Sequence, residues 1–192
     1  MFDYKNRFKK AAIGMSLAAM LAVGVTAPAL AADTVTGTVT SGSLTASIAD
    51  LTLGSVAYSH NSQTTSGTMA LTVDDSTGTG DGWNVTVLAS AFVYSGDNGG
   101  TNIAASNLAF NTLAAPVYVD GQAIDGINGP LKDGANDATT LDSARRVIYA
   151  NAEYGSGQYT QNLPVVLTIP ETSRAGTYTS TLTVTAAAGP GA

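Results

Sequence analysis

Short stretches in which apolar and polar residues alternate recur along this chain. A period of two places successive side chains on opposite faces of a β-strand, so each stretch predicts a strand with one buried face. The apolar members of the clearest stretches are Leu44, Ala46 and Ile48; Met69, Leu71 and Val73; Trp83, Val85 and Val87; and Leu163, Val165, Leu167 and Ile169. Clusters of Gly, Asn, Asp and Ser separate these stretches. The pattern predicts an all-β fold, an antiparallel β-sandwich of short strands.

The alternation is most regular near the C-terminal end. Tyr178, Ser180, Leu182 and Val184 fall on one face of a predicted last strand, and threonines occupy the other face. Threonine suits a solvated strand face because its branched Cβ favours extended backbone while its hydroxyl stays hydrated. We therefore expect the threonine face to be turned to solvent.

Two segments depart from this pattern. Residues 120–142 show no clear period, and we expect a long irregular loop there, with one turn of helix near Leu141 to Arg145. Tyr149, Tyr154 and Tyr159 surround a Gly-rich segment that we expect to form a hairpin. Tyrosines in such a segment bind sugars in some proteins, but more often they are amphipathic edge residues.

The first residues have a different character from the rest of the chain. Lys5, Arg7, Lys9 and Lys10 precede an apolar run over residues 11–27, and small residues follow at Ala29 to Ala31. This order of basic, apolar and small residues is typical of a secretory signal peptide. We predict a signal peptide over residues 1–31, cleaved after Ala31 or Ala32, and one domain over residues 32–192. A retained membrane anchor is the alternative, and no later stretch approaches the length of a span.

Charge and cysteine content narrow the function. The chain has 14 Asp and Glu against 8 Lys and Arg, and half of the bases lie in the predicted leader. The remaining bases are Lys132, Arg145, Arg146 and Arg174. Nucleic acid and anionic membranes are therefore not expected as partners, because both require clustered positive charge. With no cysteine, an exported domain must be held together by burial, backbone pairing and any bound ions.

The sequence offers little support for catalysis. His60 is the single histidine, in a polar turn-like segment, and there is neither a cysteine nor a G-x-S-x-G motif. A glycosidase needs two carboxylates facing one cleft, whereas the acids here lie mostly in Gly-rich turns. We predict that the protein is not an enzyme.

Metal binding is a more open question. Zinc is not expected without cysteines or a histidine cluster. Calcium binds carboxylates and carbonyls on flexible loops, and Asp74, Asp75 and Asp81 lie close together in a Gly-rich loop. Asp120, Asp125, Asp133 and Asp137 give the long loop similar potential. Neither loop has the D-x-D-x-D-G spacing of a strong calcium motif, so solvated turn carboxylates are the competing interpretation. We predict no cofactor other than this calcium.

Trp83 is the only tryptophan. Because it shares a strand face with Val85 and Val87, the first interpretation is a core residue. The functional alternative is a partly exposed ring that stacks on a sugar or on a partner strand.

Two segments together resemble the WxL domain of bacterial surface proteins. Gly82 to Val87 reads GWNVTV after an acidic Gly-rich loop, similar to that family's first Trp-x-hydrophobic motif. Residues 163–190 read LPVVLTIPETSRAGTYTSTLTVTAAAGP, similar to its C-terminal pattern of a strand ending in Pro, an Ala-Gly-Thr-Tyr turn and a last strand. The family's second Trp-x-Leu would fall on Val184, Thr185 and Ala186, so both of its marker residues are replaced here.

The resemblance implies a fold and a location. It implies an exported surface protein that associates non-covalently with the cell wall, through peptidoglycan, beside other surface proteins. The residues it implies for wall or partner contact are Trp83, Asn84, Val85 and Tyr178. If the paired tryptophan motifs make that contact, this chain has half of it.

A second function is open from the residues themselves. The segment from Thr34 to Ile48 is extended in pattern, and it could pair with a strand edge of another copy. Repeated, this pairing would build an extracellular filament or surface layer as a homopolymer. The competing interpretation is an ordinary first strand in its own sheet.

Overall fold

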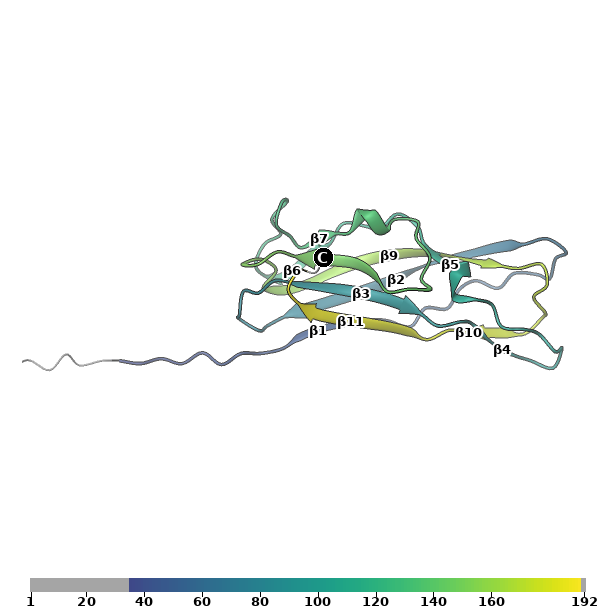
Figure 1. Cartoon of the computed structure of the whole chain (residues 1–192), viewed down its shortest axis with the longest axis horizontal. Coiled ribbons are helices and arrows are strands. Elements are labelled where there is room, and N and C mark those ends of the chain that lie inside the picture. Colours follow the sequence, from purple (N-terminus) through teal and green to yellow (C-terminus); the bar gives the residue numbers. More distant parts are fainter. Residues whose placement is uncertain (1–34, 191–192) are drawn as a thin grey trace, which may run out of the picture. The chain divides into compact units, whose positions relative to one another are not determined.

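A computed structural model describes residues 35–190 (Figure 1). The predicted signal peptide and both candidate cleavage points lie outside the described residues. The chain divides into two units, Met1–Thr38 and Val39–Ala192, and every described strand belongs to the second unit. Within residues 35–190 no helix is both long and apolar enough to cross a membrane.

The first sheet is built around two long strands. β2 (Gln63–Asp75) and β9 (Gly157–Ile169) pair antiparallel without a break in register along their whole length. The sheet order is β1-β2-β9-β5, and β6 also pairs with β9. The shorter members are β1 (Leu44–Ile48), β5 (Leu108–Phe110) and β6 (Val117–Gly121). β1 therefore lies beside β2 of its own sheet, as an ordinary first strand does.

The second sheet has the order β11-β3-β8-β7. Its strands are β3 (Trp83–Ala89), β7 (Leu131–Lys132), β8 (Arg145–Ala150) and β11 (Leu182–Ala188). β4 (Val93–Ser95), which follows β3 in the chain, and β10 (Thr177–Thr179), which precedes β11, form a small separate pair. Short 3-10 turns occur at η1 (Ala105–Asn107) and η2 (Gly134–Asn136). All pairings between named strands are antiparallel, which confirms the predicted all-β fold.

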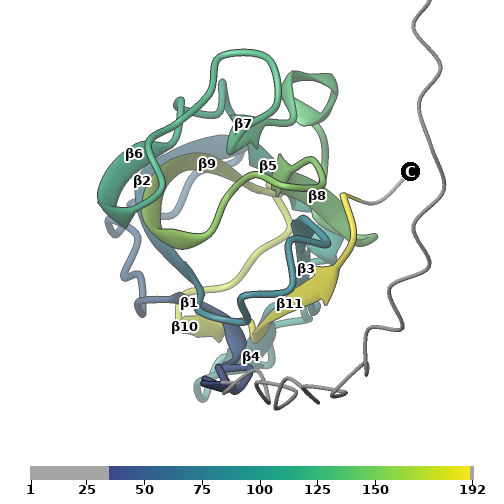
Figure 2. The same ribbon diagram turned by 90° about the vertical axis from the view of Figure 1, so that its left-hand side faces the viewer.

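The two larger sheets share one hydrophobic core. Figure 2 looks along the strands, with β2, β6 and β9 on one side and β3, β8 and β11 on the other. The strands predicted from alternation supply most of the buried side chains. These are Met69, Leu71 and Val73 from β2; Trp83, Val85 and Val87 from β3; and Leu163, Val165 and Leu167 from β9. The period of two thus identified the inward faces correctly.

Three local predictions were wrong. The last strand is interrupted after Thr179, because β10 pairs with β4 whereas β11 pairs with β3. Leu141 to Ser143 form a bend, and the helical turn lies earlier, at η2. The Gly-rich segment after β8 is no hairpin, because β8 belongs to the second sheet and β9 to the first. All three local structures depend on contacts with strands that are distant in sequence, which a local residue pattern does not reveal.

Trp83 is the largest fully buried side chain. Its indole N–H donates to the carbonyl of Gly155, 2.8 Å away, on the segment that crosses between the sheets. Gly155 has a φ of +84°, and a Cβ there would stand 2.7 Å from Trp83 Nε1. Glycine is therefore required at this position, both for its backbone conformation and for the space the ring occupies. The tryptophan ties the crossing segment to the core.

We expect Trp83→Ala to lower the free energy of unfolding by about 3–5 kcal/mol, because it removes the largest buried side chain and leaves a cavity. Trp83→Phe retains most of the burial but removes the donor to Gly155, and a cost of about 1–3 kcal/mol is expected. Urea unfolding followed by circular dichroism measures both. Equal stability of Trp83→Ala and the wild type would contradict the structural role assigned to this ring.

A second prediction concerns the buried tyrosine beside Trp83. Burial, with a contribution from the charge of Asp75, raises the pKa of Tyr159 to about 12. The unfolded chain ionises this phenol near pH 10, so between about pH 10 and pH 12 the unfolded state binds fewer protons than the folded state. Stability should therefore fall as pH rises through that window. Urea unfolding at pH 8, 10 and 11 should show the loss, and Tyr159→Phe should show a shallower one.

Candidate functional site

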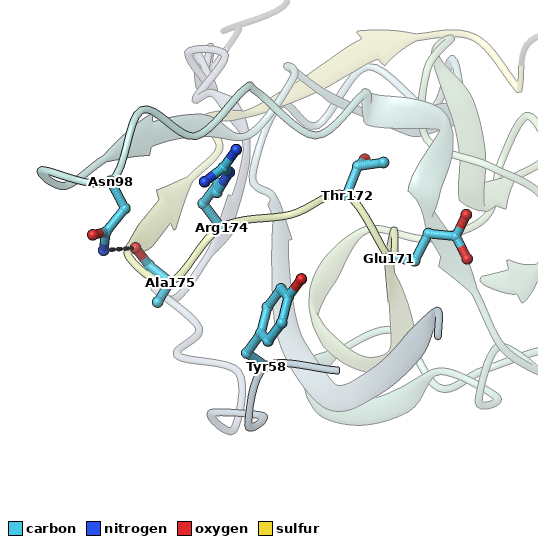
Figure 3. A pocket seen from close by; sticks show the side chains of 6 residues that line it. All are labelled: Tyr58, Asn98, Glu171, Thr172, Arg174 and Ala175. Carbon is cyan, nitrogen blue, oxygen red and sulfur yellow. Dashed lines mark hydrogen bonds between the residues drawn. The ribbon is translucent and has the colours of Figure 1, made fainter. Parts of the chain in front are cut away.

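A polar pocket lies at the end of the domain that carries β4 and β10 (Figure 3). It has a volume of about 590 Å³ and is lined by Tyr58, Asn98, Glu171, Thr172, Arg174 and Ala175. Tyr58 comes from the segment before β2, Asn98 from the loop after β4, and the others from the connection between β9 and β10. Segments far apart in the sequence therefore build one surface site.

Two tyrosines hold the connection that carries most of the pocket residues. The hydroxyl of Tyr178 donates to the carbonyl of Arg174 at 2.8 Å and accepts from the Arg174 backbone N–H at 2.9 Å. The Tyr94 hydroxyl donates to the carbonyl of Ala175 at 3.0 Å, and the Asn98 side-chain amide donates to the same carbonyl at 2.9 Å. The two tyrosine rings pack against each other, with centroids 5.2 Å apart. These contacts fix the backbone from which Arg174 extends.

Arg174 differs from the other bases of the described chain. Lys132 pairs with Asp137, Arg145 with Asp142 and Arg146 with Asp133. Within residues 35–190 the structure records no ion pair for Arg174, which is exposed at the pocket. The guanidinium is a rigid fork of donors suited to carboxylates. The pocket therefore combines a cation available for a ligand with an aromatic ring, an amide and a carboxylate.

The predicted contact residues fall into two groups. Trp83 and Val85 are fully buried between the sheets, so in this conformation neither side chain has surface to offer a ligand. Asn84 is half-buried and donates its side-chain amide to the carbonyl of Gly189 at 2.8 Å. Tyr178 lies beside the pocket, where its hydroxyl bonds the backbone of Arg174. The structure thus separates Tyr178 from the three residues of the tryptophan motif.

Sequence reasoning did not predict the pocket's other lining residues as members of a binding site. Tyr58 stands beside His60, with ring centroids 5.4 Å apart, in a segment without regular structure. Arg174 could have been found from charge alone, because few bases remain outside the leader. The absence of an acidic partner for Arg174 within residues 35–190 becomes visible only in the folded structure.

The acidic loops are held by local hydrogen bonds. Asp75 accepts from the backbone N–H and the hydroxyl of Thr77, at 3.0 and 2.6 Å. Asp74 lies in β2 opposite Thr45 of β1, and Asp81 lies in the loop that follows β2. Nowhere in the described part of the chain do three or more acidic or histidine side chains gather as a metal site would require. The predicted calcium site at Asp74, Asp75 and Asp81 stays a prediction.

Acids of the long loop cap turns and pair with bases. Backbone N–H groups of Ile127 and Asn128 donate to Asp125 and lower the pKa of its carboxyl group. A backbone N–H of Leu113 donates to Asp137 and has the same effect on its pKa, with a smaller contribution from Lys132. These carboxylates stabilise the loop that covers β8.

Comparison with known proteins identifies a family over most of the chain. A family model described as WxL domain, surface cell wall-binding, matches residues 26–190. No curated protein and no solved structure matches the chain.

Proposed function

The chain belongs to the WxL family of cell wall-binding surface domains, which places it at the cell surface or cell wall, and we propose that it binds peptidoglycan non-covalently and without catalysis through the Arg174 pocket. Peptidoglycan offers carboxylates on its peptide stems and hydroxyl and acetamido groups on its glycan strands. The pocket offers a matching group for each: Arg174 for a carboxylate, Asn98 and Thr172 for hydrogen bonds, and the Tyr58 ring for a sugar face.

The observation that carries this proposal is that, within residues 35–190, Arg174 has no recorded ion pair. The chain is acidic overall, with a formal net charge of −6, so its surface as a whole repels an anionic polymer. Binding then depends on a point where positive charge is not already neutralised. Arg174 is such a point, and Tyr178 and Tyr94 hold it in place.

The geometry of the pocket supports binding rather than turnover. Glu171 is its single acidic lining residue, whereas hydrolysis of a glycosidic bond uses a pair of carboxylates across one cleft. The lining residues include no nucleophile beside a general base.

A second candidate function, assembly into an extracellular filament, is favoured by a different observation. Val35 and Val39 are fully exposed in the segment that precedes β1. Exposed valines at alternating positions of a strand-like sequence are suited to pairing with another sheet.

Arg174→Gln should reduce binding to purified peptidoglycan sacculi at least about tenfold, since a charge-assisted contact contributes roughly 1.5–3 kcal/mol. Arg145→Gln is the matched control, because it removes the same charge from a residue already paired with Asp142. Co-sedimentation of the exported protein with sacculi, at low and high salt, measures both variants. The wild-type affinity should also fall as salt rises.

Equal loss of binding in Arg174→Gln and Arg145→Gln would indicate a general charge effect and contradict the pocket. Failure of the wild-type protein to sediment with sacculi at all would contradict peptidoglycan as the ligand.

A further inference from the structure

One stretch of the first sheet has an open edge. β1 covers the edge of β2 only from Leu71 to Asp75, and no other described strand pairs with β2 on that side. Thr64, Ser66 and Thr68 lie further along the same edge. Because the carbonyl of Ala70 and the N–H of Ser76 both point toward the β1 side, even-numbered residues of this unbroken strand direct their backbone groups there. The backbone groups of those three residues are therefore available for pairing.

An apolar groove lies just inside this edge. It has a volume of about 930 Å³, and its floor includes Met69, Leu108 and Leu167. The residues that follow β1 line the groove as an irregular strap, defined here as residues 50–58. Leu51 and Leu53 of the strap pack on Gly67, where a Cβ would stand 2.9 Å from Leu53 Cδ2.

Few bonds hold the strap to β2. The Thr65 hydroxyl donates to the carbonyl of Gly54 at 2.9 Å, and the Ala49 N–H reaches the carbonyl of Ala70 at 3.4 Å just before the strap begins. No ladder of backbone bonds joins the strap to β2 in the described chain. The strap packs side chains against this part of β2 but leaves the backbone groups of its edge without a strand partner in the described chain.

A segment of the same chain has the residue pattern of a strand that could pair with this open edge. Residues 34–40 read TVTGTVT, so Val35, Gly37 and Val39 share one face of an extended segment and threonines share the other. Val35 and Val39 are fully exposed in the structure. Seated beside β2, the valine face would enter the groove and the threonine face would continue the outer surface formed by Thr64, Ser66 and Thr68, which is exposed.

This strand must come from another copy. Leu44 lies opposite Asp75, and Thr68 is seven residues further along β2, which is about 23 Å. Val39 is five residues before Leu44, and even a fully extended segment of that length spans only about 18 Å. A chain therefore cannot seat Val39 beside its own Thr68 while β1 stays paired.

We propose that residues 35–40 of one copy pair with the Thr64–Thr68 edge of a second copy, antiparallel to β2, and displace the strap. The copy that supplies the strand is called the donor, and the copy that receives it the acceptor. The donor's folded domain begins at residue 44, after the inserted strand. β1 of the acceptor occupies the Asp75 end of the edge, so the donor's domain must lie beyond the Gln63 end, which makes the inserted strand antiparallel to β2. Donor and acceptor are different surfaces of one chain, so the contact repeats head to tail and builds an open filament. This inference rests on the filament alternative and does not require wall binding at Arg174, although Tyr58 belongs both to the strap and to the Arg174 pocket.

The test compares two double variants of the exported protein. Val35→Thr with Val39→Thr removes the apolar donor face while retaining strand propensity. Val117→Thr with Val119→Thr makes the same change on the exposed edge strand β6 and is the matched control. Analytical ultracentrifugation over a range of concentrations should show assemblies for the wild type and the control, and a monomer for the donor variant.

Cross-linking locates the acceptor. The chain contains no cysteine, so Thr38→Cys protein can be mixed with Thr64→Cys, Ser66→Cys or Thr68→Cys protein and treated with a short bismaleimide. A dimer that forms in at least one mixture, and more strongly than with Val119→Cys protein, is the expected result.

Three results would overturn the inference: a wild type that is monomeric at every concentration, a donor variant that assembles like the wild type, or no cross-link at any acceptor position. A monomeric wild type would also remove the filament alternative, whereas assembly without the donor valines would keep the filament and reject only this contact. Sacculus binding by the donor variant, measured in parallel, reports on Arg174 separately.

Discussion

The structure depends on the burial of alternate side chains between two sheets. With no cysteine in the chain, no disulfide contributes, and the sheets are joined by their shared core and by the segments that cross between them. Trp83 is central to this arrangement because it fills the core from β3 and bonds the crossing segment at Gly155. The exposed faces of β10 and β11 carry threonines, so the domain combines an apolar interior with a hydroxyl-rich exterior.

This core separates structural from functional residues. The family's tryptophan motif lies inside, where its ring and its valine neighbour hold the sheets together. The groups suited to a wall polymer lie at one end, on loops held by Tyr94 and Tyr178. A stable sandwich that presents a positioned loop cluster is a common arrangement for binding domains. The tryptophan motif is therefore placed to stabilise the fold, whereas the contact with the wall is proposed at Arg174.

The sequence predicted the strands better than their partners. Alternation located β1, β2, β3 and β9 and their buried faces because each face is decided locally by a period of two. It missed the break between β10 and β11 and the crossing from β8 to β9, because both depend on strands distant in sequence. The family resemblance predicted Tyr178 as a contact residue, but Tyr58 and Asn98 come near it only through tertiary folding. Likewise, the sequence alone does not show that Arg174 has no acidic partner in the described part of the chain.

Hydrogen–deuterium exchange in the presence of soluble peptidoglycan fragments tests the assignment of contact to the loop cluster most directly. Contact at the Arg174 pocket predicts added protection from exchange in residues 94–100 and 171–178, with no change around Trp83. Protection confined to β3 and β11, with none in the loop cluster, would show that the tryptophan motif makes the contact and would contradict the account.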